Sequence, residues 1–159
     1  MDGLRWIPAS NLKNWSESRL ENIRQLIIQT TGESYQTLRL RKLPLDEKFG
    51  LWILSDGSTD HGLLWAMKMS AKHARVLAFS VAENLQGNGY GSKGWSHFAR
   101  AAQSSGIRTV QLEVRQDNFE AVQMYHRRGL RPKGCLRGFY RGYDGWLMLG
   151  PLHVNASSQ

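Results

Sequence analysis

Six residues between an apolar run and a helical pattern have the composition of a phosphate-binding loop: Gln86-Gly87-Asn88-Gly89-Tyr90-Gly91. The preceding run, Leu77–Val81, is typical of a strand, and the helical pattern begins at Gly91. Glycine has no Cβ, so the backbone of such a turn can approach a ligand closely. The unpaired N–H groups and the dipole at the start of the following helix favour an anion. The segment therefore predicts the binding of a pyrophosphate.

A second group of chemically capable residues follows a predicted strand, Thr109–Val114. Glu113 lies on the polar face of that strand, where a glutamate is most often only solvated. Asn118 is a favourable N-cap for a helix. Ala121 and Tyr125 are one helical turn apart and share a face. A tyrosine at such a position is usually a core or boundary residue, so neither Glu113 nor Tyr125 predicts chemistry by itself.

Taken together, the two segments resemble the GNAT superfamily of N-acetyltransferases. The pattern Gln-x-x-Gly-x-Gly at 86–91 matches the acyl-CoA-binding loop of that family. The second block repeats the family's Asn, Ala, Tyr and Gly at matching spacing, as Asn118, Ala121, Tyr125 and Gly129. The resemblance extends over Leu77–Leu149 and is greatest to the branch of ribosomal-protein-alanine N-acetyltransferases, which acetylate protein N-termini.

The resemblance implies a transferase that moves an acetyl group directly from acetyl-CoA to a primary amine, with no acyl-enzyme. It implies that Glu113 deprotonates the amine, directly or through water, and that Tyr125 protonates the departing thiolate. The backbone N–H of Val81 would donate to the thioester oxygen. The residues that would contact acetyl-CoA are Phe79, Val81, Gln86, Gly87, Asn88, Gly89, Gly91, Ser92, Asn118 and Tyr125. No metal is implied, because the histidines lack the spacing of metal ligands.

Three positions depart from the family's pattern. Glu83 stands where a proline is usual, and Gly87 and Ser92 stand where basic residues are common. Two positive charges that would neutralise phosphates are therefore missing. Lys93, one place after Ser92, is the predicted substitute.

A competing motif overlaps the loop, since Gly89–Gly94 also satisfies G-x-G-x-x-G, the dinucleotide-binding fingerprint. That fingerprint opens the first βαβ unit of a parallel sheet, whereas here it follows an apparent antiparallel meander. An NAD-dependent oxidoreductase would also leave Asn118 and Tyr125 unexplained. We therefore rank this interpretation below the acetyltransferase.

The remaining patterns predict the elements that position these residues. The predicted strands are Leu4–Ile7, Phe49–Leu54, Leu63–Met69, Arg75–Val81, Thr109–Val114, Leu130–Tyr140 and Gly145–Leu149. The predicted helices begin at Ser16, Gly91 and Asn118 and end near Thr31, Ser104 and Arg128. Tyr35–Leu45 is ambiguous between strand and helix. The order predicts an α/β (α+β) protein with the GNAT fold, a mixed central sheet of about six to seven strands flanked by helices.

Length and composition limit the remaining alternatives. The 159 residues predict a single domain over 1–153 and a disordered polar tail over 154–159. The formal net charge of +8 favours anionic partners, although the basic residues are scattered. Cys135 is the only cysteine, so no internal disulfide forms. With no signal or membrane-spanning pattern, we expect a cytoplasmic protein without membrane contact.

The acceptor is the least determined partner. The branch resemblance favours a protein N-terminal amine, with a lysine or a small-molecule amine as the alternative. A different class also stays open, in which the chain is a non-catalytic module that binds CoA, RNA or the ribosome. The sequence leaves the choice between a monomer and a dimer open.

Overall fold

The computed structural model describes residues 3–9, 11–31, 40–42, 45–140 and 142–153. Within these residues, seven strands form one sheet in the order β1-β2-β3-β4-β5-β7-β6. The strands are β1 (Arg5–Pro8), β2 (Leu51–Ser55), β3 (Asp60–Ser70), β4 (His73–Val81), β5 (Thr109–Arg115), β6 (Arg131–Tyr140) and β7 (Tyr143–Pro151). Neighbouring strands are antiparallel except β4 and β5, which run parallel.

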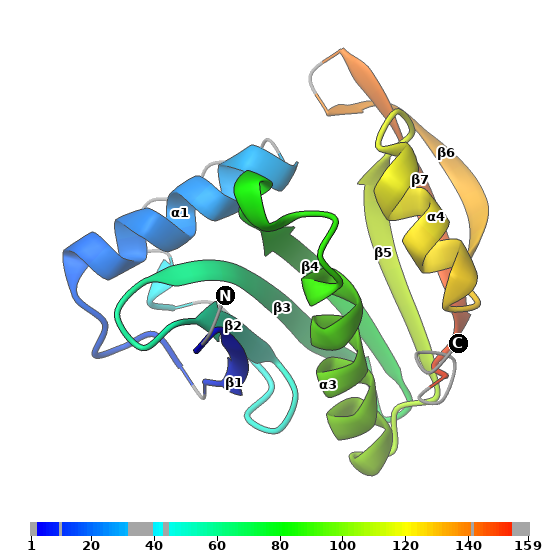
Figure 1. Cartoon of the computed structure of the whole chain (residues 1–159). Coiled ribbons are helices and arrows are strands. Elements are labelled where there is room, and N and C mark those ends of the chain that lie inside the picture. The colour runs from blue at the N-terminus through cyan, green and yellow to red at the C-terminus, as the bar shows by residue number, and fades with distance from the viewer. Residues whose placement is uncertain (1–2, 10, 32–39, 43–44, 141, 154–159) are drawn as a thin grey trace.

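Helices cover both faces of this sheet (Figure 1). Helix α1 (Glu17–Thr31) packs on β3 and β4, where Leu20, Ile23 and Ile27 are buried at helical spacing. Helices α3 (Tyr90–Ser104) and α4 (Phe119–Arg127) lie on the opposite face, preceded in the chain by a short 3-10 helix, η1 (Glu83–Leu85). Each face therefore has its own apolar core, which is the usual arrangement for an amphipathic helix on a sheet.

The parallel pair β4–β5 is joined over only part of its length. The register pairs His73 with Thr109 and ends at Val76 with Leu112. At that point β4 contains a bulge, because Ala66 opposes Val76 while Trp65 opposes Ala78, which leaves Leu77 without an opposite residue. A bulge bends a strand and increases its twist. Beyond it, β4 and β5 separate, and Figure 1 shows the two strands diverging toward the end that carries η1.

The structure confirms the predicted mixed sheet flanked by helices, and β3 and β7 extend furthest beyond their predicted ranges. β3 begins at Asp60 rather than Leu63, and β7 covers Tyr143–Pro151 rather than Gly145–Leu149. Both strands pair on two sides, so backbone hydrogen bonds extend them past their apolar residues. The ambiguous segment Tyr35–Leu45 lies mostly outside the described residues, and the predicted tail 154–159 lies wholly outside them.

Across the described parts of the chain, no helix is both long enough and apolar enough to cross a membrane.

Candidate active site

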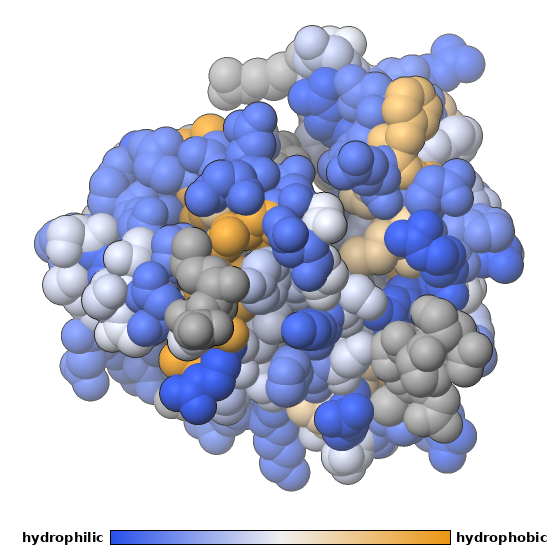
Figure 2. Space-filling view, in the orientation of Figure 1, coloured by the Kyte–Doolittle hydropathy of each residue, from blue (hydrophilic) through white to orange (hydrophobic). Residues whose placement is uncertain are grey.

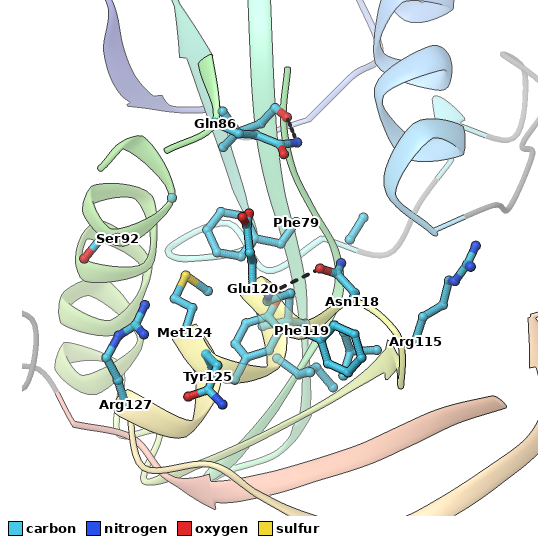
Figure 3. A pocket seen from close by; sticks show the side chains of 18 of the residues that line it. Phe79, Gln86, Ser92, Arg115, Asn118, Phe119, Glu120, Met124, Tyr125 and Arg127 are labelled. Atoms are coloured by element: carbon cyan, nitrogen blue, oxygen red, sulfur yellow. Dashed lines mark hydrogen bonds between the residues drawn. The ribbon is translucent and has the colours of Figure 1, made fainter. Parts of the chain in front are cut away.

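A cavity of about 580 Å³ lies where β4 and β5 separate. Its walls come from β4, the loop before α3, β5, α4 and Tyr140 at the end of β6 (Figure 3). In Figure 2 the surface is hollowed between the side that carries α1 and the side that carries α4. The predicted site residues that line this cavity are Phe79, Val81, Gln86, Gly87, Gly89, Gly91, Ser92, Glu113, Asn118 and Tyr125. Asn88 is the predicted residue that is not in the lining.

The glycine loop has a conformation that requires glycine. Gly87 and Gly89 have φ angles of 82° and 83°, in the left-handed region that L side chains rarely adopt. A Cβ on either residue would meet nothing within 4 Å, so open space lies beside the backbone. Gly89 is also the N-cap of α3. The N–H groups of the first helical turn have no acceptor within the helix, and Gly91 and Ser92 of that turn line the cavity.

Two amide side chains brace this loop. Gln86 Nε2 donates to the carbonyl oxygen of Val81 at 2.9 Å. Asn88 Nδ2 donates to the carbonyl oxygens of Leu85 and Gln86, at 3.0 and 3.2 Å. The structure therefore gives Asn88 a role inside the loop, and its predicted contact with a ligand stays a prediction.

The free edge of β4 presents backbone donors to the cavity. Ala82 N–H donates to the carbonyl oxygen of His61 at 2.7 Å, on the β3 side. Successive residues of a strand direct their N–H groups to opposite edges, so the N–H of Val81 points toward β5. Phe79 lies two residues before Val81 in the strand, so its N–H points to the same edge. Beyond the bulge β5 no longer pairs with this edge, and both residues line the cavity.

Glu113 is held by an arginine that the sequence analysis missed. Its Oε1 accepts a hydrogen bond from Arg75 Nε at 3.1 Å and a second, shorter one from Arg75 Nη2. The Glu113 side chain is 13% exposed. A second cross-strand contact lies beside this pair and continues it as a row of polar side chains. His73 Nδ1 is 2.7 Å from Thr109 Oγ1, and His73 Nε2 is 2.6 Å from Gln111 Oε1. The row lies opposite the buried Leu112 and Val114, so Glu113 reaches the cavity from the α1 side of the sheet.

Tyr125 reaches the same cavity from the other side. It is buried, and its ring centroid lies 5.6 Å from that of Trp95 of α3. Burial raises the pKa of the Tyr125 phenol well above its usual value of about 10, and the nearby phenol of Tyr140 raises it further. The hydroxyl therefore keeps its proton across the physiological range, so it is able to donate a hydrogen bond but not to accept a proton as a base.

Asn118 caps α4 as the sequence predicts. Its side-chain oxygen accepts a hydrogen bond from the Ala121 backbone N–H at 3.3 Å. Ala121 and Tyr125 both line the cavity, which confirms that they share a face of α4. Any contact between Asn118 and a ligand stays a prediction.

Lys93 does not reach the cavity lining. Its ammonium lies 5.9 Å from the centroid of the Tyr90 ring, on the exposed side of the first turn of α3. The cations that line the cavity are Arg115 and Arg127. Lys93, the predicted substitute for the missing basic residues, therefore does not lie at the cavity wall.

The dinucleotide interpretation does not fit this topology. The Gly89–Gly94 segment lies in the β4-α3-β5 unit, but this unit follows the antiparallel strands β2 and β3. Within the described sheet β4–β5 is the only parallel pair, so the segment does not open a parallel sheet. The downstream acid, Glu113, is paired with Arg75 on the sheet face opposite the loop's helix.

Comparisons with known proteins give one consistent result. A model of the acetyltransferase (GNAT) family matches residues 20–130. This match begins well before Leu77, where the resemblance in the motifs began. No curated protein matches the sequence.

Solved structures of similar fold include three GNAT-type proteins. Ard1 from Thermoplasma volcanium is 24% identical with a TM-score of 0.78, over 95% of this chain and 99% of that one. The ribosomal-protein-S18-alanine N-acetyltransferase from Escherichia coli is 16% identical with a TM-score of 0.76, over 94% of each chain. A GNAT family acetyltransferase from Elizabethkingia anophelis with acetyl-CoA bound is 13% identical with a TM-score of 0.72, over 96% and 100%. With the family match over most of its length, this chain belongs to the GNAT family of acetyltransferases.

Proposed function

We propose that this acetyltransferase moves an acetyl group directly from acetyl-CoA to a primary amine, and that the amine is a protein N-terminus. The observation that carries the proposal is one cavity that opens through the sheet. It is lined by the glycine loop and Tyr125 on the α3–α4 side and by Glu113 on the α1 side. Two substrates can therefore approach one point from opposite faces, as direct transfer requires.

The α3–α4 wall of the cavity fits acetyl-CoA and is called the donor side below. Open space lies beside Gly87 and Gly89, and the first turn of α3 presents N–H groups for the pyrophosphate. The edge of β4 presents further N–H donors, that of Phe79 for the amide-rich pantetheine arm and that of Val81 for the thioester end of the donor. A solved GNAT structure of similar fold holds acetyl-CoA. When bound, acetyl-CoA supplies a thioester whose carbonyl carbon is electrophilic.

The α1 wall carries Arg75 and Glu113 and is called the acceptor side below. An amine is mostly protonated at neutral pH and must lose a proton before it attacks. Glu113 takes that proton, directly or through a water molecule. Arg75 holds one carboxylate oxygen, which leaves Oε2 as the oxygen that faces the amine.

The remaining groups act on the thioester. The Val81 N–H donates to the thioester oxygen, where negative charge develops. A C–N bond forms, the C–S bond breaks, and Tyr125 O–H donates its proton to the departing sulfur. The attacking nitrogen releases its excess proton as the amide forms, and that proton restores the Tyr125 phenol. The raised pKa keeps Tyr125 protonated before each transfer.

A protein N-terminus is the proposed acceptor for three reasons. The sequence motifs are most similar to the branch that acetylates ribosomal-protein alanines. A ribosomal-protein-S18-alanine N-acetyltransferase is also among the structures of similar fold. The net charge of +8 further favours acceptors in an acidic or ribosomal environment.

The test is an acceptor screen with acetyl-CoA. One peptide has a free N-terminus and no lysine, a second has a blocked N-terminus and one lysine, and a third set contains small amines. We expect release of CoA and addition of one acetyl group to the first peptide only. Acetylation confined to lysine or to a small amine would refute the acceptor, and binding of NAD in place of acetyl-CoA would refute the donor.

A further inference from the structure

Arg128 is a buried cation that lies behind Ser92, a residue of the cavity wall, although Arg128 itself is not part of the lining. It is the C-cap residue of α4 and is only 4% exposed. Its Nη2 donates to the carbonyl oxygen of Ser92 at 2.9 Å and, at a shorter distance, to the Ser92 hydroxyl. Its Nη1 is fully buried and has no hydrogen-bond partner within the described residues. The guanidinium thus packs against the first turn of α3 with part of its donor capacity unused.

The electrostatic setting of Arg128 is unfavourable in the absence of an anion. No carboxylate forms an ion pair with it among the residues that the structure describes. It lies at the positive N-terminal end of α3, where the helix dipole disfavours a cation. Burial lowers the pKa of the Arg128 guanidinium, and the neighbouring charge of Arg127 lowers it further. A buried charge without a partner is costly, so this arrangement calls for an anion from outside the chain.

The residue that Arg128 contacts is the one at which this sequence lacks a charge. Ser92 stands directly after the last glycine of the loop, where the resemblance to the GNAT pattern expects a basic residue. The predicted substitute, Lys93, does not line the cavity, whereas Ser92 does. The missing charge at the loop therefore coincides with an extra buried charge behind it, contributed by a different helix.

We propose that Arg128 supplies, from α4, the positive charge that the Gln86–Ser92 loop lacks, and so acts as a positioning residue for the pyrophosphate of the donor. This inference rests on the proposed use of acetyl-CoA. Arg128 acts in two ways. Its hydrogen bonds hold the carbonyl and hydroxyl of Ser92 and thereby orient the first turn of α3. Its charge raises the positive electrostatic potential at that turn. Because the guanidinium is buried in surroundings of low polarity, that potential is screened only weakly.

A purely structural tether between α3 and α4 makes a different prediction. If Arg128 only held the helices together, its loss would lower the stability of the free protein and weaken every ligand of the cavity equally. Under the proposal, Arg128 is a buried charge without an ionic partner. Its replacement by an apolar residue then leaves the free protein equally stable or more stable. Only ligands that carry phosphate then lose affinity.

The experiment compares two donors by calorimetry, acetyl-CoA and S-acetylpantetheine, which lacks the phosphates. For Arg128→Met we expect the dissociation constant of acetyl-CoA to rise about 10-fold or more, and that of S-acetylpantetheine to change less than about 2-fold. The melting temperature of the ligand-free variant should equal or exceed that of the unmodified protein. An unchanged affinity ratio between the two donors would overturn the proposal.

Three further variants keep the result interpretable. Arg128→Lys retains the charge and should retain most of the difference in affinity between acetyl-CoA and S-acetylpantetheine. This variant still tests the proposal if the methionine variant folds poorly. The double variant Ser92→Arg with Arg128→Met moves the charge back to the loop and should restore acetyl-CoA affinity. Arg100→Met removes an exposed charge from α3, the helix that Arg128 contacts, and should leave the ratio of the two donor affinities unchanged.

The outcome is also separable from the proposed function. If the unmodified protein binds neither donor, the use of acetyl-CoA is wrong. If it binds both donors and Arg128→Met weakens them equally, the donor is right and Arg128 is only a tether.

Discussion

The two walls of the cavity are built in different ways. The donor side presents mainly backbone groups from one contiguous stretch, Gln86–Ser92, whose left-handed glycines and helix start are local features. The acceptor side presents a side-chain pair, Arg75 of β4 with Glu113 of β5. These two residues are 38 positions apart in the chain. Under the proposed function, donor binding and proton transfer depend on separate parts of the molecule, and substitutions should affect one without the other.

The largest separation is expected from Glu113→Gln. Loss of the general base should lower kcat about 100-fold or more, while the dissociation constant of acetyl-CoA stays within about 2-fold. Steady-state kinetics and calorimetry on the same preparation check this. The exposed Glu47→Gln provides a control for loss of one carboxylate. An unchanged rate near neutral pH would remove Glu113 as the base.

Tyr125→Phe is the second test. If the Tyr125 hydroxyl donates to the leaving sulfur as proposed, its removal should lower kcat by about 10- to 100-fold. Acetyl-CoA should still bind, because the ring continues to pack on Trp95. The exposed Tyr143→Phe is the matched control. Full activity would leave Tyr125 with a packing role only.

Arg75→Met tests whether the acceptor side needs its ion pair. Without the hydrogen bonds to Oε1 the carboxylate of Glu113 loses its fixed orientation, and kcat should fall about 10-fold with little change in donor affinity. Arg75→Lys, which keeps the charge and can donate one hydrogen bond, should recover part of the rate. Weaker binding of acetyl-CoA in the methionine variant would show that the two walls are coupled.

Gly89→Ala tests the donor side alone. Alanine in the left-handed conformation costs about 1–2 kcal/mol, so the loop should shift and the affinity for acetyl-CoA should fall about 10-fold. The rate at saturating donor should remain near that of the unmodified protein. Gly106→Ala is matched, because Gly106 has a φ of 94° at the other end of α3. An equal loss of affinity in both variants would indicate general destabilisation rather than a local effect on the loop.

The smallest expected effect concerns stability at high pH. Since burial raises the pKa of Tyr125 above that of an unfolded tyrosine, the folded state resists ionisation. Its contribution to stability is complete below about pH 10 and is lost as the pH rises beyond that value. The free energy of unfolding can be measured by chemical denaturation from about pH 8 to about pH 11, a range that spans the ordinary tyrosine pKa. It should fall less steeply with pH for Tyr125→Phe than for the unmodified protein. Identical slopes would mean that Tyr125 titrates normally.

Local features of the sequence predicted most of the donor side. The glycine loop, the cap at Asn118 and the shared face of Ala121 and Tyr125 all depend on residues within a few positions of one another. The structure places each of these at the cavity except Asn88, which braces the loop, and Tyr90. The order of the elements was also sufficient for the mixed sheet.

The pairing of Arg75 with Glu113 was not predictable in the same way. Arg75 reads as one more polar residue on an alternating strand, and nothing local reveals that β4 lies beside β5. Arg128 was missed for the same reason, since an arginine at the end of a helix is usually exposed. Its burial arises only when α4 packs against the first turn of α3.

The sequence by itself thus determined the family, the order of the elements and the loop that suits a pyrophosphate, because these follow from short-range periodicity and from the conformations that glycine allows. The tertiary structure decided where charge lies around that loop and what holds Glu113. Strand order and helix packing bring together groups that are distant in the chain, and electrostatic energy depends on distance and burial in space. The bulge at Leu77 belongs to this second class, since its consequence, the separation of β4 from β5, exists only within the assembled sheet.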